Sequence, residues 1–318
     1  MEPRLRRIRL GDPRQHVVAD VDPAPRAGLR DNPDMLEELT AAALLDACDH
    51  ARSLDRSRFE TLTDLAHAEA LQTGIAVARL ARGERQVGYK IGFTNRSIWP
   101  LYQVFHPIWA PVWTATLRAA SPDDPARVTA ARFVEPRLEP EIVVGLRESP
   151  AADTPEAVLA AAEWIAHGFE IVQSPFPDWR FSGAEAIAAQ GLHGALLLGP
   201  RRPLSILDEA WPSAPAGSGE PIPGPLAQRA LARIGDLEVE LRCDGRTVER
   251  GRGANVLDGP MHAIAYMARE LRRRGRSIEP GSLVSTGTLT DAQPLKPGQR
   301  WQSRVSGLDL PGLTVVVD

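Results

Sequence analysis

Two glutamates stand two residues apart in the segment PRLEPEIVVGL, residues 136–146. Most of the segment is apolar, which predicts a buried strand. Side chains at positions i and i+2 of a strand point to the same face, so Glu139 and Glu141 share one face. Carboxylates this close repel each other unless a cation lies between them. The spacing therefore predicts a cation at this face.

A third acid, Glu170, lies in the segment HGFEIVQSP, between Phe169 and Ile171, where a second buried strand is predicted. Three strand carboxylates without a Cys or His cluster suit a hard cation, Mg²⁺ or Mn²⁺, better than zinc or copper. In the alternative interpretation each glutamate pairs with an arginine. The residues alone leave both interpretations open.

Lysine is rare in this chain: of 37 basic residues, only Lys90 and Lys296 are lysines. Lys296 lies in the predicted turn PLKPGQR, where a solvated surface charge is expected. Lys90 lies in GYKIGFTN, at the end of a predicted strand. A lysine is a compact ammonium that can hold an anion or exchange a proton, which arginine cannot usefully do. Lys90 is therefore a candidate site residue.

The elements that must position these residues are mostly strands. Apolar residues at three- and four-residue spacing predict helices within residues 35–84. Pro136 and Pro140 cannot donate to a ladder, which predicts an edge or bulged position for the strand of the paired glutamates. A helix is predicted over residues 154–168, and the aromatic, proline-rich segment 99–113 is predicted to be a structured loop.

The order of these patterns predicts an α+β fold. We expect a loosely ordered N-terminal arm over residues 1–34, a helical lobe over 35–84 and a mainly β domain over 85–318. A Pro/Gly/Ser-rich stretch at 208–228 is predicted to be a surface insertion. Strands and helices do not alternate evenly and no GxGxxG follows a first strand, which argues against a doubly wound fold.

The composition excludes several classes of protein. The net charge of −4 indicates neither a nucleic-acid partner nor an anionic membrane surface. The two cysteines, Cys48 and Cys243, form no CxxC motif and fit a reducing compartment. No apolar run is long enough to span a membrane, and the N-terminus lacks the apolar core of a signal peptide. We expect a cytoplasmic protein.

Five blocks of the sequence resemble, in order, those of the fumarylacetoacetate hydrolase superfamily. They are GYKIGFTN, EPRLEPEIVVGL, EIVQS with DWRFSGAEAIAAQG, GRGANVLDGPMHAIAYMAREL and LVSTGTLT. The branch of 2-keto-4-pentenoate hydratases and 4-oxalocrotonate decarboxylases is the most similar one. The resemblance implies a distorted β-sandwich roll, a site for Mg²⁺ or Mn²⁺, and self-association into at least a homodimer.

The resemblance also implies roles for single residues. Glu139, Glu141 and Glu170 fall at the family's metal-ligand positions, and Lys90 falls at its active-site lysine. Thr288 falls where the family places a hydroxyl near the substrate carboxylate. Further candidates come from the neighbouring blocks and loops: His193 and Gln190 as catalytic residues, and Asn255 and His106 as substrate-binding residues.

The sequence departs from the branch at two places. The branch commonly has Asp-Ser-Arg after the third glutamate, where this chain has Gln173, Ser174 and Pro175. It commonly has Ala-Asp-Asn where this chain has Ala188, Ala189 and Gln190. The acid is replaced in both blocks, which predicts a changed set of acid and base groups.

The predicted activity is that of a metal-dependent lyase acting on a small 2-oxo acid through a stabilised enolate. Hydration of a 2-hydroxy-2,4-dienoate is the leading reaction. Decarboxylation of a 2-oxo diacid is the second alternative, and hydrolysis of an acylpyruvate is the third. A metal-binding homologue without catalysis is the fourth, because of the changed positions 173 and 189.

Overall fold

Helices begin the described part of the chain, which comprises residues 36–121, 123–212 and 222–318 of a computed structural model. Thr40 caps the first helix by accepting a hydrogen bond from the Ala43 N–H, and Asp64 caps the second in the same way. The helices are α1 (Ala41–Asp49), α2 (Leu65–Ala81), α3 (Trp99–Tyr102), α4 (Pro155–Ala161), α5 (Gly183–Ala188), α6 (Gly224–Asp236) and α7 (Pro260–Arg273).

Residues 36–318 form one unit. The predicted arm 1–34 lies outside the described residues, and the predicted domain boundary after residue 84 stays a prediction. The strands are β1 (Gln86–Gly92), β2 (Ile108–Trp113), β3 (Leu117–Ala119), β4 (Ala126–Val128), β5 (Arg137–Leu146), β6 (Ala162–Val172), β7 (His193–Leu198), β8 (Arg202–Pro203), β9 (Glu238–Cys243), β10 (Arg246–Arg252), β11 (Leu283–Thr288), β12 (Gln293–Pro294), β13 (Arg300–Ser306) and β14 (Thr314–Val317).

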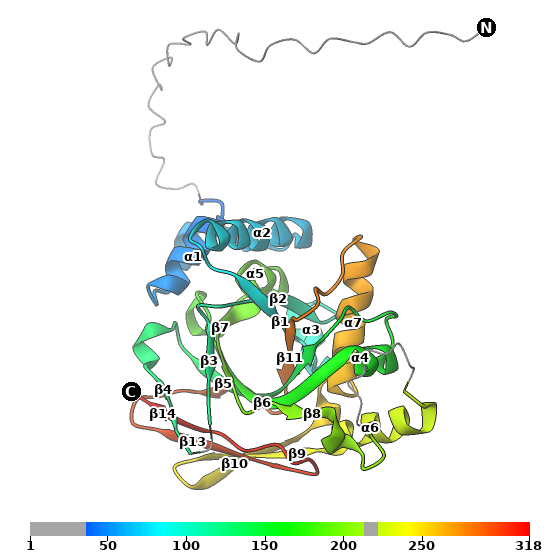
Figure 1. The fold of residues 1–318 in the computed structure, drawn as a ribbon. Helices are drawn as coiled ribbons and strands as arrows, with labels where there is room; N and C mark the ends of the chain where they lie inside the picture. The colour runs from blue at the N-terminus through cyan, green and yellow to red at the C-terminus, as the bar shows by residue number, and fades with distance from the viewer. Residues whose placement is uncertain (1–35, 122, 213–221) are drawn as a thin grey trace, which may run out of the picture. The chain divides into compact units, whose positions relative to one another are not determined.

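The larger sheet has nine strands and curls strongly around its own axis (Figure 1). Its order is β2-β1-β11-β5-β6-β7-β3, with β12 paired to β5 and β8 to β6. The central pair, β5 and β6, is antiparallel and almost entirely buried. Burial on both faces explains why these strands have nearly continuous apolar sequences.

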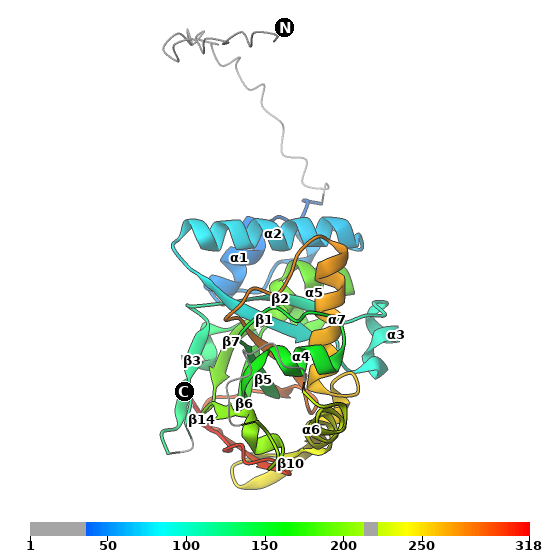
Figure 2. The ribbon, with the colours of Figure 1, turned by 45° about the vertical axis from the view of Figure 1, so that its right-hand side comes forward.

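The smaller sheet has five strands in the order β10-β9-β13-β14-β4. It packs on the larger sheet through apolar side chains such as Phe169 and Leu197 from one sheet and Trp301 and Val315 from the other. Helices α4, α6 and α7 cover β1, β5 and β11 with a second apolar cluster, and Figure 2 shows α4 and α7 in front of these strands. Helices α1, α2 and α5 share a third cluster. The predicted α+β class, mainly β with N-terminal helices, is confirmed.

The strand of the paired glutamates is central, so its predicted edge position is wrong. β5 lies between β11 and β6. A sheet interior accepts Pro140 because the ladder between β5 and β11 is irregular between Ser285 and Thr288. The Pro140 carbonyl there accepts a hydrogen bond from the Leu289 N–H, at 2.9 Å. The irregularity therefore lies in the partner strand.

Two further local predictions need correction. Segment 99–113 contains α3 and β2 in place of a loop, and Pro111 is tolerated because β2 ends the sheet. The helix predicted over 154–168 ends at Ala161, because the following residues pair with β5 along its length. Sheet pairing overrides the local helical pattern there.

The predicted insertion at 208–228 coincides only in part with an irregular segment. Residues 213–221 lie outside the described residues. Helix α6 begins at Gly224, and its Leu226 and Ala227 are buried against the core. The last five residues of the range therefore belong to a packed helix. Among the described residues, no helix combines the length and the apolar character needed to cross a bilayer.

Candidate metal centre and its cavity

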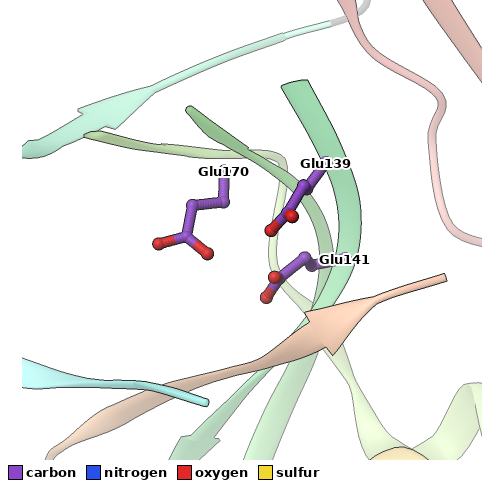
Figure 3. Close-up of side chains that lie close together, drawn as sticks. All are labelled: Glu139, Glu141 and Glu170. Atoms are coloured by element: carbon purple, nitrogen blue, oxygen red, sulfur yellow. The ribbon is translucent and has the colours of Figure 1, made fainter. Parts of the chain in front are cut away.

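Three carboxylates meet on the central strands of the larger sheet (Figure 3). Glu139 and Glu141 come from β5 and Glu170 from β6, and one oxygen of each lies within 4.8 Å of the others. Glu139 is directly opposite Glu170 in the β5–β6 register. The alternation along β5 and the register with β6 together explain the cluster, because opposed residues project to the same face.

The irregular end of β11 supplies donors to one of these acids. The Ser285 hydroxyl donates to Glu141 Oε2 at 2.5 Å, and the Gly287 N–H donates to the same oxygen at 3.0 Å. Gly287 has φ +112°, and a Cβ there would lie 2.2 Å from Thr94 Oγ1. This glycine is required by close approach of the chain. Two hydrogen bonds thus hold one carboxylate oxygen of Glu141, Oε2.

Lys90 lies beside the third acid. Its Nζ is 3.0 Å from Glu170 Oε2 and donates to the Gly191 carbonyl at 2.8 Å. Parallel pairing of β1 with β11 brings Lys90 opposite Ser285, close to the acids. The lysine is 2% exposed. Lys90 is therefore a buried neighbour of the acids, and its predicted role as a site residue stays a prediction.

His193 holds the other oxygen of Glu170. Its Nδ1 lies 2.7 Å from Glu170 Oε1, and its Nε2 lies 2.8 Å from Thr116 Oγ1. Burial lowers the pKa of His193 despite the opposing attraction of Glu170, so the ring is neutral near pH 7. A neutral ring that donates from Nδ1 accepts at Nε2. His193 therefore orients Glu170, and it does not line the cavity described below.

Burial and mutual repulsion distort the titration of the acids. Burial raises the pKa of Glu139 to about 7, and Lys90 partly opposes this. Burial, with repulsion from Glu170 and Glu139, raises the pKa of Glu141 well above its usual value. Burial also opposes ionisation of Glu170, but Lys90 and His193 outweigh it and lower its pKa. Burial lowers the pKa of Lys90, and attraction to Glu170, Glu139 and Glu141 outweighs this, so the net pKa is raised.

The residues present fit a hard divalent cation. Glu141 Oε1 is buried and has no hydrogen-bond partner among the described residues. Glu170 Oε2 has only the Lys90 ammonium beside it. One lysine cannot neutralise three clustered carboxylates, and a buried carboxylate without a partner is costly. Oxygen donors of this kind match Mg²⁺ and similar ions.

A cavity of about 190 Å³ opens beside Glu139. Its polar wall includes Lys90, Asn95, Arg137 and Thr288. Its apolar wall includes a stack of rings in which Tyr102 lies 4.9 Å from Phe93 and 5.0 Å from Phe181, measured between centroids. A concave site with few polar groups on an otherwise apolar wall is typical of small-molecule binding.

The predicted hydroxyl Thr288 lines this cavity, and it donates to the Thr290 carbonyl at 2.7 Å. Gln190 is placed elsewhere: its amide oxygen accepts from Trp113 Nε1 at 3.1 Å and its nitrogen donates to the Gln72 carbonyl at 3.1 Å. Both ends of the amide are used in joining α2, β2 and the chain after α5. The predicted catalytic role of Gln190 has no support in this geometry.

Asn255 and His106 also lie away from the cavity wall. Asn255 donates to the Leu289 carbonyl at 2.9 Å and so anchors the turn after β11. His106 follows the left-handed residue Gln103 (φ +52°) and lines a separate, smaller pocket with Gln72 and Trp109. Neither residue lines the cavity beside Glu139, and the substrate-binding roles predicted for them stay predictions.

At the two places where the sequence departs from the branch, the side chains bind other parts of the chain or pack in the core. The Gln173 side chain accepts from the Val134 N–H at 3.1 Å, and the Ser174 hydroxyl donates to the Phe176 carbonyl at 2.8 Å. Ala189 is buried in the apolar cluster of α1, α2 and α5. These positions present no acid to the cavity. The ionisable side chains of the cavity wall are Lys90, Arg137, Glu139, Asp291 and Tyr102.

Sequence reasoning missed Arg137 and Ser285. A signal for Arg137 was present, because it precedes Glu139 by two residues on the same strand and so lies on the same face. No sequence signal marks Ser285, since its role depends on the register between β11 and β5.

Comparisons with known proteins agree with this fold. Residues 108–315 match the family described as fumarylacetoacetate (FAA) hydrolase C-terminal. The chain is 29% identical over 246 residues to a 4-oxalocrotonate decarboxylase from Pseudomonas sp, covering 76% of this chain and 83% of the relative. It is 26% identical over 286 residues to 2-keto-4-pentenoate hydratase 1 from Dechloromonas aromatica (strain RCB), covering 87% and 96%.

A solved structure shares the fold. The 4-oxalocrotonate decarboxylase from Pseudomonas putida G7, complexed with magnesium and adipate, superposes with a TM-score of 0.72 at 22% identity, covering 87% of this chain and 95% of that one. The predicted fold of the resemblance, a curled β-roll with N-terminal helices, is thereby confirmed. The family match spans well over half of the sequence, and the chain therefore belongs to the fumarylacetoacetate hydrolase family.

Proposed function

We propose that this chain is a divalent-metal-dependent lyase acting on a small 2-oxo acid, with Mg²⁺ or Mn²⁺ held by Glu139, Glu141 and Glu170. The leading reaction is hydration of a 2-hydroxy-2,4-dienoate. The observation that carries the proposal is the convergence of three carboxylates and a buried lysine, because two of these residues, Glu139 and Lys90, line one cavity. Relatives named as 2-keto-4-pentenoate hydratases support the reaction.

Glu139, Glu141 and Glu170 would hold a divalent ion, which would supply Lewis-acid chemistry to a 2-oxo acid. Lys90 adds a positive charge at the same wall. Because its pKa is raised, it stays an ammonium and stabilises negative charge on the substrate oxygen instead of removing a proton. Of the two roles that the sequence left open for Lys90, holding an anion and exchanging a proton, we therefore assign it the first.

The proton balance of hydration requires three steps. The C2 hydroxyl gives its proton to water, which leaves negative charge on that oxygen, and C5 then takes a proton from water. Water finally adds across C3 and C4, with the hydroxyl on C4 and the proton on C3. The chain holds the charged intermediate: Lys90 faces the oxygen, and the stacked rings of Phe93, Tyr102 and Phe181 exclude bulk water from the diene.

Decarboxylation of a 2-oxo diacid is the second candidate. The relative that is 29% identical is named 4-oxalocrotonate decarboxylase, and so is the structure with the TM-score of 0.72. The same stabilised enolate serves both reactions, so the metal centre alone does not separate them. We further propose that the protein acts in the cytoplasm as a homodimer or a larger homo-oligomer, as the family resemblance implies.

The test is turnover of a panel of 2-oxo acids by chelator-stripped protein with and without Mg²⁺ or Mn²⁺. Metal-dependent loss of dienoate absorbance without CO₂ release supports the hydratase, and CO₂ release supports the decarboxylase. Acylpyruvate cleavage would favour the hydrolase instead. Metal binding without any turnover would identify a homologue that has lost catalysis. Metal affinity that is unchanged in Glu139→Ala would refute the site itself.

A further inference from the structure

Arg137 is a cation at the cavity wall that forms no ion pair with a described residue, although it is close enough to Glu139 to lower the pKa of that acid. It is half-buried in β5, and among the described residues its guanidinium makes no hydrogen bond and no ion pair. The one exposed acid of the wall, Asp291, does not pair with it. Most other arginines of the described sheets and helices that are as buried as Arg137, such as Arg79, have a carboxylate partner. The N–H groups of Arg137 are thus available to a ligand.

The guanidinium of Arg137 lies over the ring of Trp179. The Arg137 carbon Cζ lies 4.0 Å from the centroid of the Trp179 ring, within the range of a cation–π contact. Stacking uses the face of the guanidinium and leaves its N–H edge free for bidentate binding of a carboxylate. An arginine that is already ordered loses less side-chain entropy when a ligand binds.

The backbone that carries Trp179 is strained. Asp178 and Trp179 have φ +55° and +56°, and Glu135 across the turn has φ +45°. Glu135 holds this arrangement, because its carboxylate accepts from the Asp178 N–H at 3.0 Å and its carbonyl accepts from Trp179 Nε1 at 2.9 Å. Non-glycine residues in this conformation are costly and persist where the surroundings enforce them. The strained turn places the ring under Arg137.

The position of Arg137 separates it from the metal ligands. It lies on the same face of β5 as Glu139, two residues away, which corresponds to about 7 Å along a strand. Glu141 lies two residues beyond Glu139 along β5, on the side away from Arg137. A ligand whose head is at the three acids can therefore extend past Glu139 toward Arg137.

We propose that Arg137, stacked on Trp179, binds a second carboxylate at the far end of the substrate, so that the substrate is a 2-oxo diacid. This inference rests on the proposed function, because it assumes that the 2-oxo acid head is held at Glu139, Glu141 and Glu170. A guanidinium stabilises a carboxylate more than the neutral CO₂ that decarboxylation would release. The inferred contact therefore favours hydration, in which the distal carboxylate is retained.

The experiment compares two matched probes, 2-oxoadipate and 2-oxohexanoate, by calorimetric titration of the full-length protein with saturating Mg²⁺ and without it. Both probes have the same head and chain length, and they differ in the distal carboxylate. We expect the wild type to bind 2-oxoadipate at least about tenfold more tightly, as for one charge-assisted hydrogen bond or more. Arg137→Gln should remove this preference and leave the affinity for 2-oxohexanoate unchanged.

Three further variants sharpen the test. Arg180→Gln removes a neighbouring exposed charge that does not line the cavity, so it should keep the preference. Trp179→Leu removes the stack and should reduce the preference, whereas Trp179→Phe should retain most of it. If Arg137→Gln does not fold by circular dichroism, Arg137→Lys keeps the charge without the planar fork and should show a reduced preference.

The outcomes are distinguishable. Equal binding of both probes by the wild type, or a preference that survives in Arg137→Gln, overturns the inference and leaves the proposed function intact. Binding of neither probe in a Mg²⁺-dependent way overturns both. A preference that Arg180→Gln also removes would assign the effect to general charge and would overturn the role of Arg137.

Discussion

Neutralising Glu139 should stabilise the protein without metal and destabilise it relative to the wild type with metal. Burial raises the pKa of Glu139 from 4.5 to about 7. Since the unfolded chain ionises near 4.5, folding is favoured most below that pH, and this contribution is lost as the pH rises toward 7. The difference between these two pKa values corresponds to a loss of roughly 3 kcal/mol at most in the free energy of unfolding. Glu139 is half-buried at a cavity wall, so solvent screening reduces the value to about 1–2 kcal/mol.

The assay is urea denaturation of the wild type and of Glu139→Gln at pH 5 and pH 8. In chelator at pH 8 the variant should have the larger free energy of unfolding, by about 1–2 kcal/mol, and at pH 5 the difference should shrink. Mg²⁺ at a hundredfold excess over its dissociation constant should add about 2.7 kcal/mol to the wild type. The variant has lost a ligand and should gain less, so that the order of stability is reversed.

Glu163→Gln is a matched control, because Glu163 is an exposed glutamate on β6, outside the cluster. It should change neither the pH dependence nor the gain from Mg²⁺. The reasoning is refuted if Glu139→Gln is less stable than the wild type in chelator at both pH values, or if Mg²⁺ stabilises the two proteins equally.

Three other perturbations follow from the same contacts. Lys90→Met removes the ammonium that lies 3.0 Å from the buried Glu170 carboxylate. The free energy of unfolding in chelator should therefore fall by about 3 kcal/mol. An unchanged urea midpoint would contradict this. Burial lowers the pKa of His167 to about 4, so stability should fall by about 3 kcal/mol as the pH drops from 6.5 to 4, and His167→Gln should flatten this profile. Gly287→Ala places a Cβ 2.2 Å from Thr94 Oγ1 on a residue with φ +112°. It should lower the melting temperature and also weaken Mg²⁺ binding. Loss of stability with intact Mg²⁺ affinity would show that the Gly287 N–H does not support the site.

Predictions from local patterns succeeded where one strand decides the outcome. The period of two along PRLEPEIVVGL placed Glu139 and Glu141 on one face, and β5 shows that arrangement. They failed where another element competes. The helical pattern of 154–168 gave way after Ala161 to pairing with β5, because burial in a central sheet outweighs helix propensity.

In the candidate site, too, local properties and contacts with remote elements have separate effects. Amide side chains such as those of Gln190 and Asn255 are suitable for catalysis by type, but the fold uses them to satisfy carbonyls and a ring nitrogen. Buried polar groups must find partners, and which partner is nearest depends on the packing of remote elements. Residue type alone therefore does not identify which amide side chains reach the cavity.

The sequence by itself determined which residues could bind a hard cation, because carboxylate chemistry and strand alternation are local properties. It also marked Lys90 through the rarity of lysine. Only the tertiary structure decided that Glu170 lies opposite Glu139 and that Lys90 lies 3.0 Å from Glu170. The same holds for Trp179, which lies under Arg137. These contacts join segments far apart in the chain, and their register is set by burial of the whole sheet rather than by any one segment.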